Sequence, residues 1–232
     1  MTAVDNKPLD EHPGLRERKK AATRRAIRLS ALELFAAKGF SKVTVEDIAE
    51  AAEVSPRTFF NYFPSKEATI FGNEPEATEV LLRRLAAEPP SLGPREALRS
   101  VLVDWVRSMA EDTEGLGCDL PRVMELMREA AADPAFSAAR AAEMAAMERA
   151  LAQGLAERLG TDKDRDPYPA LLASSAVGAL KVASFFWANL GGKVPVEALV
   201  GAGLQAIVEG LPEQCTLRQI VAEGFEKGEI NR

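Results

Sequence analysis

The stretch TVEDIAEAAEVSPRTFFNYFPSKE contains two helix-start signals eleven residues apart, at Thr44 and Ser55. Thr44 and Asp47 form a T-x-x-D pattern, in which the two side chains cap the first turn of a helix. Ser55 is followed by Pro56, and a proline in the first turn lacks only an N–H that has no helical partner there. Pro64 ends the second helix. Two such short helices, joined by about four residues, predict a helix-turn-helix, which places its second helix in the major groove of DNA.

The rest of the chain also has a helical composition. Ala, Leu, Glu, Arg and Met dominate, and no run of β-branched residues alternates with polar ones, so we predict an all-α fold. The first helix is expected over 16–38. Further helices are predicted over 65–87 with a bend at GNEP, and over 95–112, 119–132, 135–159, 168–190 and 196–210. Lys181 stands at the middle of the apolar 168–190 segment, which favours a buried helix over a membrane span.

The segment LFAAKGFSKVTVEDIAEAAEVSPRTFFNYFPSKEATI resembles the N-terminal domain of the TetR (tetracycline-repressor-like) family of transcription regulators. The T-x-x-x-I-A, V-S, T-x-x-x-x-F and S-K-E positions are filled in order. The resemblance implies a helix-turn-helix domain that binds double-stranded operator DNA, followed by a helical domain that dimerises and binds a small-molecule effector. We accordingly divide the chain into an arm (1–15), a DNA-binding domain (16–66), a ligand-binding and dimerisation domain (67–211) and a C-terminal tail (212–232).

The aromatic side chains of the second short helix divide between two tasks. Phe59 and Phe63, four residues apart, share one face and are expected to fill a small core with Phe35, Phe40 and Ile48. The opposite face is polar, and Asn and Arg can read bases by paired hydrogen bonds, whereas hydroxyl groups and Lys suit phosphates. The predicted DNA contacts are Thr44, Ser55, Pro56, Arg57, Thr58, Phe60, Asn61, Tyr62 and Lys66, with Arg24, Arg25 and Arg28 of the first helix as charges on the phosphate side.

The turn departs from the TetR pattern, because Glu53 stands where relatives usually have glycine. A side chain in the left-handed conformation costs about 1 kcal/mol or more. The sequence leaves two outcomes open: the turn is reshaped, or the acidic side chain lowers the affinity for DNA.

Methionine and aromatic side chains of the second domain are either ordinary core or the lining of a cavity for an apolar or amphipathic effector. The candidate lining residues are Trp105, Met109, Met124, Met127, Met144 and Phe185. The helix that starts at Ser65 and continues past GNEP is expected to connect this cavity to the DNA-binding domain. Small residues on the last two long helices allow close approach of a second subunit. The candidate dimer contacts are Ser174, Gly178, Lys181 and Gly203.

Several function classes are excluded by composition. The single histidine, His12, lies in the predicted arm, which argues against Ser-His-Asp, Cys-His and histidine-metal sites. Cys118 and Cys215 are too few for a disulfide framework, and they form no C-x-x-C. We therefore expect no enzyme activity, cofactor or metal. Between Gly14 and Lys42 there are nine basic and two acidic residues in a chain of net charge -6, which indicates one end facing a polyanion.

The N-terminus lacks the apolar core of a signal peptide, so we expect a cytoplasmic protein without a membrane partner. The leading hypothesis is a ligand-responsive transcriptional regulator, most simply a repressor, which binds a pseudo-palindromic operator as a homodimer and is released by the effector. The alternative is a helical small-molecule binding or carrier protein in which Glu53 deforms the turn and abolishes DNA binding.

Overall fold

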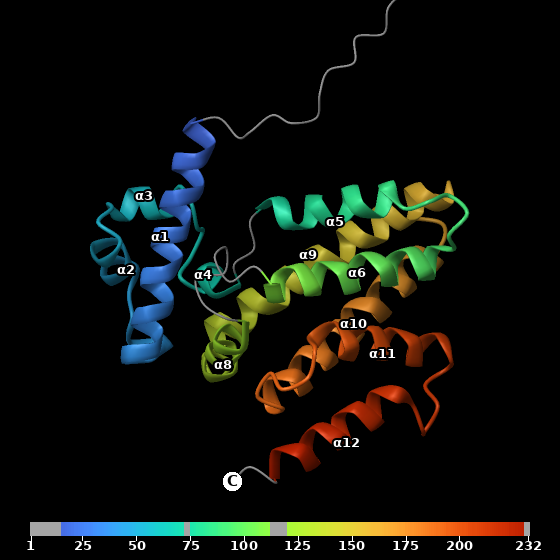
Figure 1. The fold of residues 1–232 in the computed structure, drawn as a ribbon. Helices are drawn as coiled ribbons and strands as arrows, with labels where there is room; N and C mark the ends of the chain where they lie inside the picture. Colours follow the sequence, from blue (N-terminus) through green and yellow to red (C-terminus); the bar gives the residue numbers. More distant parts are fainter. Residues whose placement is uncertain (1–14, 72–74, 112–119, 230–232) are drawn as a thin grey trace, which may run out of the picture.

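The computed structural model describes residues 15–71, 75–111 and 120–229, and every regular element in these ranges is helical (Figure 1). The all-α prediction is confirmed. Residues 1–14, His12 among them, Gly72 of GNEP and Cys118 lie outside the described residues. The elements are α1 (Leu15–Lys38), η1 (Phe40–Lys42), α2 (Val45–Ala51), α3 (Pro56–Phe60), α4 (Glu67–Phe71), α5 (Pro75–Ala87), α6 (Pro94–Glu111), α8 (Leu120–Ala130), α9 (Pro134–Leu159), α10 (Tyr168–Asn189), α11 (Val196–Val208) and α12 (Thr216–Glu229).

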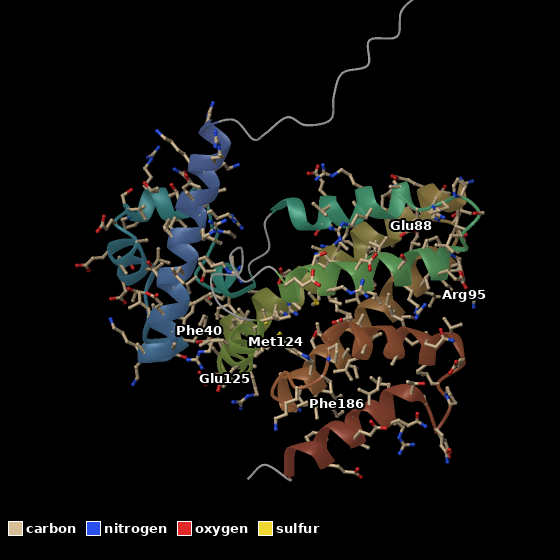
Figure 2. The ribbon with its side chains drawn as sticks, in the orientation of Figure 1. Phe40, Glu88, Arg95, Met124, Glu125 and Phe186 are labelled. Carbon is tan, nitrogen blue, oxygen red and sulfur yellow. The ribbon has the colours of Figure 1, made fainter. Side chains whose placement is uncertain are left out.

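The first hydrophobic core, here the N-terminal core, lies among α1, α2, α3 and α4. Phe59 and Phe63 are buried with Phe35, Phe40 and Ile48, as predicted. The helix is shorter than predicted, because α3 ends at Phe60, so Phe63 lies beyond it rather than on its inner face. The Phe35 and Phe40 ring centroids are 5.0 Å apart, a normal distance for a favourable aromatic pair. In Figure 2, Phe40 lies where the N-terminal helices meet α8.

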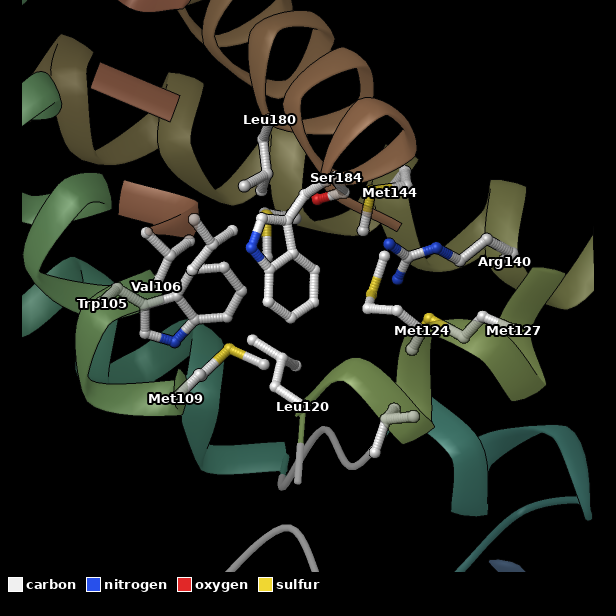
Figure 3. A pocket seen from close by; sticks show the side chains of 14 residues that line it. Trp105, Val106, Met109, Leu120, Met124, Met127, Arg140, Met144, Leu180 and Ser184 are labelled. Carbon is white, nitrogen blue, oxygen red and sulfur yellow. The ribbon is translucent and has the colours of Figure 1, made fainter. Parts of the chain in front are cut away.

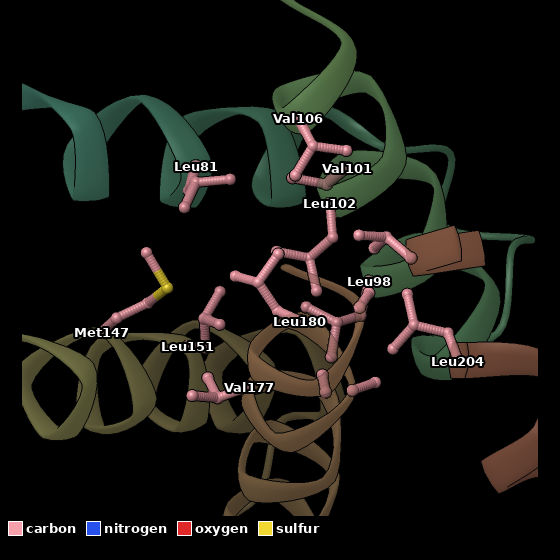
Figure 4. Close-up of a cluster of buried hydrophobic side chains, with 14 of the residues drawn as sticks. Leu81, Leu98, Val101, Leu102, Val106, Met147, Leu151, Val177, Leu180 and Leu204 are labelled. Carbon is pink, nitrogen blue, oxygen red and sulfur yellow. The ribbon is translucent and has the colours of Figure 1, made fainter. Parts of the chain in front are cut away.

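The second core, here the C-terminal core, fills the space among α5, α6, α9, α10 and α11. Leu81, Leu98, Leu102, Leu151 and Leu180 are among its buried side chains, and Figure 4 shows them converging from these helices. In the described part of the chain, α10 is the one helix long and apolar enough to cross a membrane, and 39% of its apolar window is buried within the protein. One side of α10, with Leu180 and Trp187, is buried in the C-terminal core, whereas its other side is accessible, so the prediction of a buried helix holds for one face only.

Helix α8 belongs to both cores. Its Val123, Leu126 and Ala130 are buried in the N-terminal core, whereas Leu120 is buried in the C-terminal core. Phe136, near the start of α9, completes the N-terminal core, and its ring centroid lies 5.3 Å from that of Phe40. The two halves of the chain are therefore joined by packed side chains as well as by the covalent link.

The segment after residue 212 contains a 14-residue helix, α12, which packs against α11. A Cβ built on Gly203 of α11 would lie 3.5 Å from the Cβ of Ala179 and 3.8 Å from Leu217 Cδ2. The prediction that Gly203 contacts a second subunit is wrong in this fold, because α10 and α12 cover it within the same chain. Its small size instead allows these three helices to approach one another.

Candidate nucleic-acid interface and ligand pocket

A reciprocal cap fixes the start of α2. The Thr44 hydroxyl accepts a hydrogen bond from the Asp47 backbone N–H at 3.1 Å, and the Asp47 carboxylate accepts one from the Thr44 backbone N–H at 2.8 Å. These bonds, the one from the backbone N–H most of all, lower the pKa of Asp47 from its ordinary value. The Thr44 hydroxyl also donates to the same carboxylate at 2.7 Å. A phosphate contact by this hydroxyl would have to replace that bond.

The turn between α2 and α3 keeps a left-handed residue although that residue has a side chain. Glu53 has φ 54°. Its N–H donates to the carbonyl of Glu50 at 3.0 Å, and the N–H of Val54 donates to the carbonyl of Ala49 at 2.9 Å. These are the two bonds of a Schellman motif, the usual end of a helix before a left-handed residue. Reshaping of the turn, the first of the two open outcomes, is therefore wrong, and backbone strain of about 1–2 kcal/mol is retained.

Helix α3 is capped as predicted and presents a polar outer face. Ser55 Oγ accepts a hydrogen bond from the Thr58 backbone N–H at 3.0 Å and lies 2.8 Å from Thr58 Oγ1. Arg57 and Asn61 are exposed, and Phe60 is 55% exposed, an unusual state for a phenylalanine. Pro56 is also exposed at the first position, whereas Tyr62 is half-buried against the N-terminal core.

Two arginines of α1 that were expected near phosphates, Arg24 and Arg28, make contacts within the protein. Arg24 Nη1 donates to the carbonyl of Tyr62 at 2.6 Å, and its guanidinium lies 4.2 Å from the centroid of the Phe63 ring. Arg28 is only 5% exposed and donates to the carbonyls of Thr69 at 3.0 Å and Ile70 at 3.3 Å. The phosphate role predicted for Arg28 is therefore wrong, because the side chain is buried, whereas the roles of the half-buried Arg24 and the exposed Arg25 stay predictions.

Lys66 has a similar structural role. Its Nζ donates to the carbonyls of Phe40 at 3.1 Å and Val43 at 2.9 Å, and it lies 4.4 Å from the Phe40 ring centroid. The phosphate contact by Lys66 stays a prediction, and it would have to replace these bonds, because the ammonium is directed into η1. These contacts and those of Arg24 fix α3 relative to α1 and η1.

The basic groups that do accompany α3 come from the first two turns of α1. An open groove runs between the two helices, lined by Arg16, Lys19, Lys20, Thr23, Thr58, Asn61 and Tyr62. From sequence, residues 16–20 could belong either to a mobile arm or to the first helix, and here Arg16, Lys19 and Lys20 lie on α1. Their spacing of three and four residues, which places side chains on one face of a helix, is the signal that identifies them.

A second site, here the ligand pocket, lies between α6, α8, α9, α10 and α11 (Figure 3). Trp105, Met109, Met124, Met127 and Met144 all line it, as predicted. The other lining residues are Val106, Leu120, Val123, Arg140, Met147, Leu180, Ser184, Trp187 and Val196. The free volume is about 60 Å³, well below the ~300 Å³ of small-molecule sites, so methionine side chains nearly fill the pocket.

Phe185 is not part of this pocket, and its assignment there is wrong. Its side chain is 60% exposed, because the inner face of α10 is formed by Leu180, Ser184 and Trp187. Trp187 is held in place by a hydrogen bond from its indole Nε1 to the carbonyl of Val194 at 2.6 Å. Sequence reasoning left Trp187 among the aromatic side chains that were either core or cavity lining, and the inner face of α10 now distinguishes it from Phe185.

Arg140 is the charged member of the described lining. Its Nη1 lies 3.3 Å from Glu143 Oε2, and the two side chains are 32% and 17% exposed. Burial raises the pKa of Glu143, and the nearby guanidinium opposes that rise. Sequence reasoning missed Arg140, although it is a lone cation within the alanine-rich SAARAAEMAAM segment.

The outward face of α10 carries an apolar stripe. Leu171, Val182 and Phe185 are 63%, 44% and 60% exposed. A Cβ built on Gly178 meets no heavy atom within 4 Å, and Lys181 is exposed beside it. Ser174 is also exposed, and its hydroxyl donates to the carboxylate of Glu148. Three of the four predicted dimer contacts, Ser174, Gly178 and Lys181, are thus on one accessible surface.

Comparison with known proteins covers both halves of the chain. The profile of bacterial regulatory proteins of the tetR family matches residues 27–70, and the profile of the MftR C-terminal domain matches residues 92–212. The HTH-type transcriptional regulator TcmR of Streptomyces glaucescens is 35% identical over 201 residues, which cover 87% of this chain and 88% of TcmR. The regulator MftR of Mycobacterium tuberculosis is 30% identical over 196 residues, which cover 82% of this chain and 95% of MftR.

Solved structures share the fold. The SmeT–triclosan complex superposes with a TM-score of 0.55 at 17% identity, over 83% of this chain and 98% of SmeT. The fatty acid degradation regulator FadR from Bacillus halodurans gives a TM-score of 0.52 at 20% identity, over 88% of this chain and all of that chain. Both comparisons cover more than four fifths of this chain, so its fold is one that these proteins share.

Proposed function

The chain belongs to the TetR family of bacterial transcriptional regulators, and from this premise we propose that it is a ligand-responsive repressor that binds a pseudo-palindromic operator as a homodimer. TcmR and MftR are named as transcriptional regulators, which places this chain among regulators rather than enzymes. Repression is the simplest mode of control, because a protein seated on a promoter excludes polymerase by occupancy alone. A cytoplasmic location is part of the same proposal.

The observation that carries the proposal is the surface of α3. Arg57 and Asn61 are exposed on a helix whose position is fixed by Arg24 and Lys66, and the basic groove of α1 lies beside it. Guanidinium and amide groups on a rigid helix can make bidentate contacts with guanine and adenine. We assign base reading to Arg57 and Asn61, and contacts with sugar or a thymine methyl to Phe60. Phosphate contacts are assigned to the basic residues of the groove, Arg16, Lys19 and Lys20.

The second copy of the chain is proposed to pack on the outward face of α10. Leu171, Val182 and Phe185, with Gly178 between them, offer an accessible apolar stripe that allows close helix approach. A two-fold axis through this stripe would bring the same surface of both subunits into contact. A dimer with this symmetry needs an operator whose two half-sites are related by the same symmetry, a palindrome. Two recognition helices near one helical turn apart, about 34–36 Å, would then meet successive half-sites.

The effector is proposed to bind the ligand pocket and to act through α8. Val123 lines the pocket and is also buried in the N-terminal core, and Met127 lines the pocket and packs, partly buried, against the same core. Residues of α4 and α5 are not among the described lining, and residues 72–74 of the expected lever lie outside the described residues, so we propose α8 as the connection instead. A coupling of about 1–3 kcal/mol changes operator affinity about 5- to 150-fold, and operator DNA weakens effector binding by the same factor.

The alternative, a carrier that has lost DNA binding, depended on a turn deformed by Glu53. The turn has its left-handed residue and both Schellman bonds, and Ser55 caps α3 directly after it. The stated reason for losing DNA binding is therefore removed, and the regulator is the better proposal.

Fluorescence anisotropy with the DNA upstream of the gene tests the proposal, with random DNA of equal length as the reference. Asn61→Ala is expected to weaken binding to the preferred sequence by about 1–3 kcal/mol and to affect random DNA much less. Arg83→Ala on the exposed face of α5 is the matched control and leaves both affinities unchanged. Equal losses on the two DNAs would remove Asn61 from base reading, and no sequence preference in the wild type would refute the regulator.

A further inference from the structure

The accessible face of α10 has a symmetric pattern about Gly178. Leu171 and Phe185 lie seven residues before and seven residues after this glycine, and both side chains are exposed. Seven residues are close to two helical turns, so the two side chains and Gly178 lie on one side of the helix, with about 10 Å from the glycine to each. A Cβ on Gly178 would meet no heavy atom within 4 Å, so another helix could approach α10 most closely there.

Lys181, one turn after Gly178, is the one charged residue of α10. It is exposed, and among the residues that the structure describes it forms no hydrogen bond or ion pair. A homodimer that packs on this face would bury part of the lysine, and removing an ammonium group from water is costly unless a partner replaces the water. Lysine is accordingly depleted at the centre of interfaces. Lys181 therefore requires an acceptor from the second subunit.

The acceptor that the structure offers is Glu148 on the neighbouring helix α9. Its carboxylate accepts a hydrogen bond from the hydroxyl of Ser174, which lies one turn before Gly178 and is exposed. This bond holds the carboxylate beside α10, on the opposite side of the glycine from Lys181. Within the described ranges, Glu148 pairs with no basic side chain of its own subunit. A negative and a positive group therefore flank Gly178, each about one turn away along α10.

Two copies of α10 related by a two-fold axis can align in two ways. In a parallel pair each residue faces its own copy, so Lys181 would face the partner's Lys181, and the two ammonium groups would repel each other. In an antiparallel pair that crosses at Gly178, residues at equal distances on either side of the glycine face one another. Leu171 then meets the partner's Phe185, and Lys181 meets the partner's Glu148. Opposite charges are matched only in the antiparallel arrangement.

We propose that a second copy of the chain packs antiparallel on α10, with the Lys181 ammonium of each subunit paired with the Glu148 carboxylate of the other. The inference rests on the proposed function, which contains the homodimer, and it adds the orientation of the subunits and the residues that select the partner. Symmetry places this ion pair twice in each dimer. A related subunit that lacks these charges would leave Lys181 and Glu148 unpaired at the interface, so the pair favours association of this chain with itself.

Charge reversal tests the pair, because two single variants complement each other. Lys181→Glu leaves two acidic groups at the interface and Glu148→Lys leaves two basic groups, so a homodimer of either variant has like charges at both contacts. We expect the dimer dissociation constant of each variant to rise about 10- to 100-fold in ~100 mM salt, measured by sedimentation equilibrium. In an equimolar mixture of the two variants, both contacts join opposite charges again. Heterodimers should therefore form with nearly the wild-type constant.

Isotope labelling of one variant identifies these heterodimers by their intermediate mass in native mass spectrometry. The double variant Lys181→Glu/Glu148→Lys should also dimerise as the wild type does, because it exchanges the two charges. Arg83→Glu and Glu79→Lys on the exposed face of α5 make the same charge changes away from α10 and should leave the dissociation constant unchanged. A variant that had simply lost its fold would not recover on mixing, so recovery separates the ion pair from a structural role within one subunit.

The possible results distinguish this inference from the proposed function. A wild-type dimer that both single variants retain would overturn the Lys181–Glu148 pair and leave the homodimer standing. Variants that dissociate and do not recover on mixing would also overturn it, since the two charges would then not face each other. A wild type that is monomeric at micromolar concentration would refute the homodimer of the proposed function itself. Complementary variants of a protein that binds no DNA would refute the regulator and leave the subunit contact standing.

Discussion

The left-handed turn residue allows a test in which one substitution has opposite effects at two nearby positions. At Glu53, with φ 54°, glycine removes a Cβ that is unfavourable in this conformation. At Glu50, inside α2 and also exposed, glycine introduces the ordinary penalty of a flexible residue in a helix. We therefore expect Glu53→Gly to stabilise the helix-turn-helix and Glu50→Gly to destabilise it.

The magnitudes follow from two terms of opposite sign. Relief of left-handed strain is worth about 1–2 kcal/mol. Glycine also gives the unfolded chain more freedom, which subtracts about 0.4–1 kcal/mol. The net expectation for Glu53→Gly is a stabilisation of roughly 0.5–1 kcal/mol. Glu50→Gly has no strain to relieve and should destabilise by roughly 0.5–1 kcal/mol. The two variants then differ by about 1–2 kcal/mol although their composition is identical.

The assay must report on the N-terminal core, and both tryptophans, Trp105 and Trp187, lie at the ligand pocket. Hydrogen exchange of the α2 and α3 amides, followed by mass spectrometry, measures opening of these helices directly. Glu53→Gln is the charge control, because it removes the acid but keeps the Cβ. Equal destabilisation by Glu53→Gly and Glu50→Gly would refute the strain argument. If Glu53→Gln and Glu53→Gly raise DNA affinity equally, the acid rather than the strain controls binding.

The remaining predictions concern the groove, the core and the subunit contact. The double variant Lys19→Ala/Lys20→Ala should weaken operator and random DNA alike and reduce the slope of log affinity against log salt by roughly two units; an unchanged slope would exclude both from phosphate contact. Lys66→Met should lower the free energy of unfolding by about 1–3 kcal/mol, because the Lys66 ammonium donates its hydrogen bonds to carbonyls at η1. The slope of log affinity against log salt should change little, and a slope lower by one unit would instead support a phosphate contact by Lys66. Gly178→Arg should give folded monomers in sedimentation at micromolar concentration, since a side chain there meets nothing within its own subunit; a dimer of normal stability would place the interface elsewhere.

Periodicity and capping signals predicted the helices well because they depend on residues close in sequence. Thr44, Asp47 and Ser55 make the caps that their spacing indicates, and α9 begins at Pro134 after the Asp133 cap. The shared burial of Phe59 and Phe63 was also predictable, because they are four residues apart. These features need no knowledge of how distant segments meet.

Long side chains and helix faces were harder to predict, because their partners come from distant parts of the chain. Lys66 and Arg28 look like surface cations in sequence, and each turns inward to donate hydrogen bonds to backbone carbonyls from distant parts of the chain. Phe185 and Trp187 are two residues apart on one apolar helix, and only the packing of α10 decides which faces the pocket. Gly203 is small, as residues at close contacts between subunits often are, but α12 of the same chain covers it.

The small volume of the ligand pocket explains why α8 is the helix most able to carry the signal. A ligand that needs ~300 Å³ must create roughly 240 Å³ beyond the 60 Å³ already free. The pocket walls on α6, α9 and α10 are fixed in the C-terminal core by Leu102, Leu151 and Leu180. In contrast, most of the buried side chains of α8, Leu126 among them, lie in the N-terminal core. We therefore expect expansion to move α8 away from the bundle with less loss of packing, because a close-packed interior transmits such a shift rather than absorbing it. Since Leu126 is buried with Phe63 and Ile27, the shift changes the position of α1 and α3, and DNA that holds α3 in place opposes the same expansion.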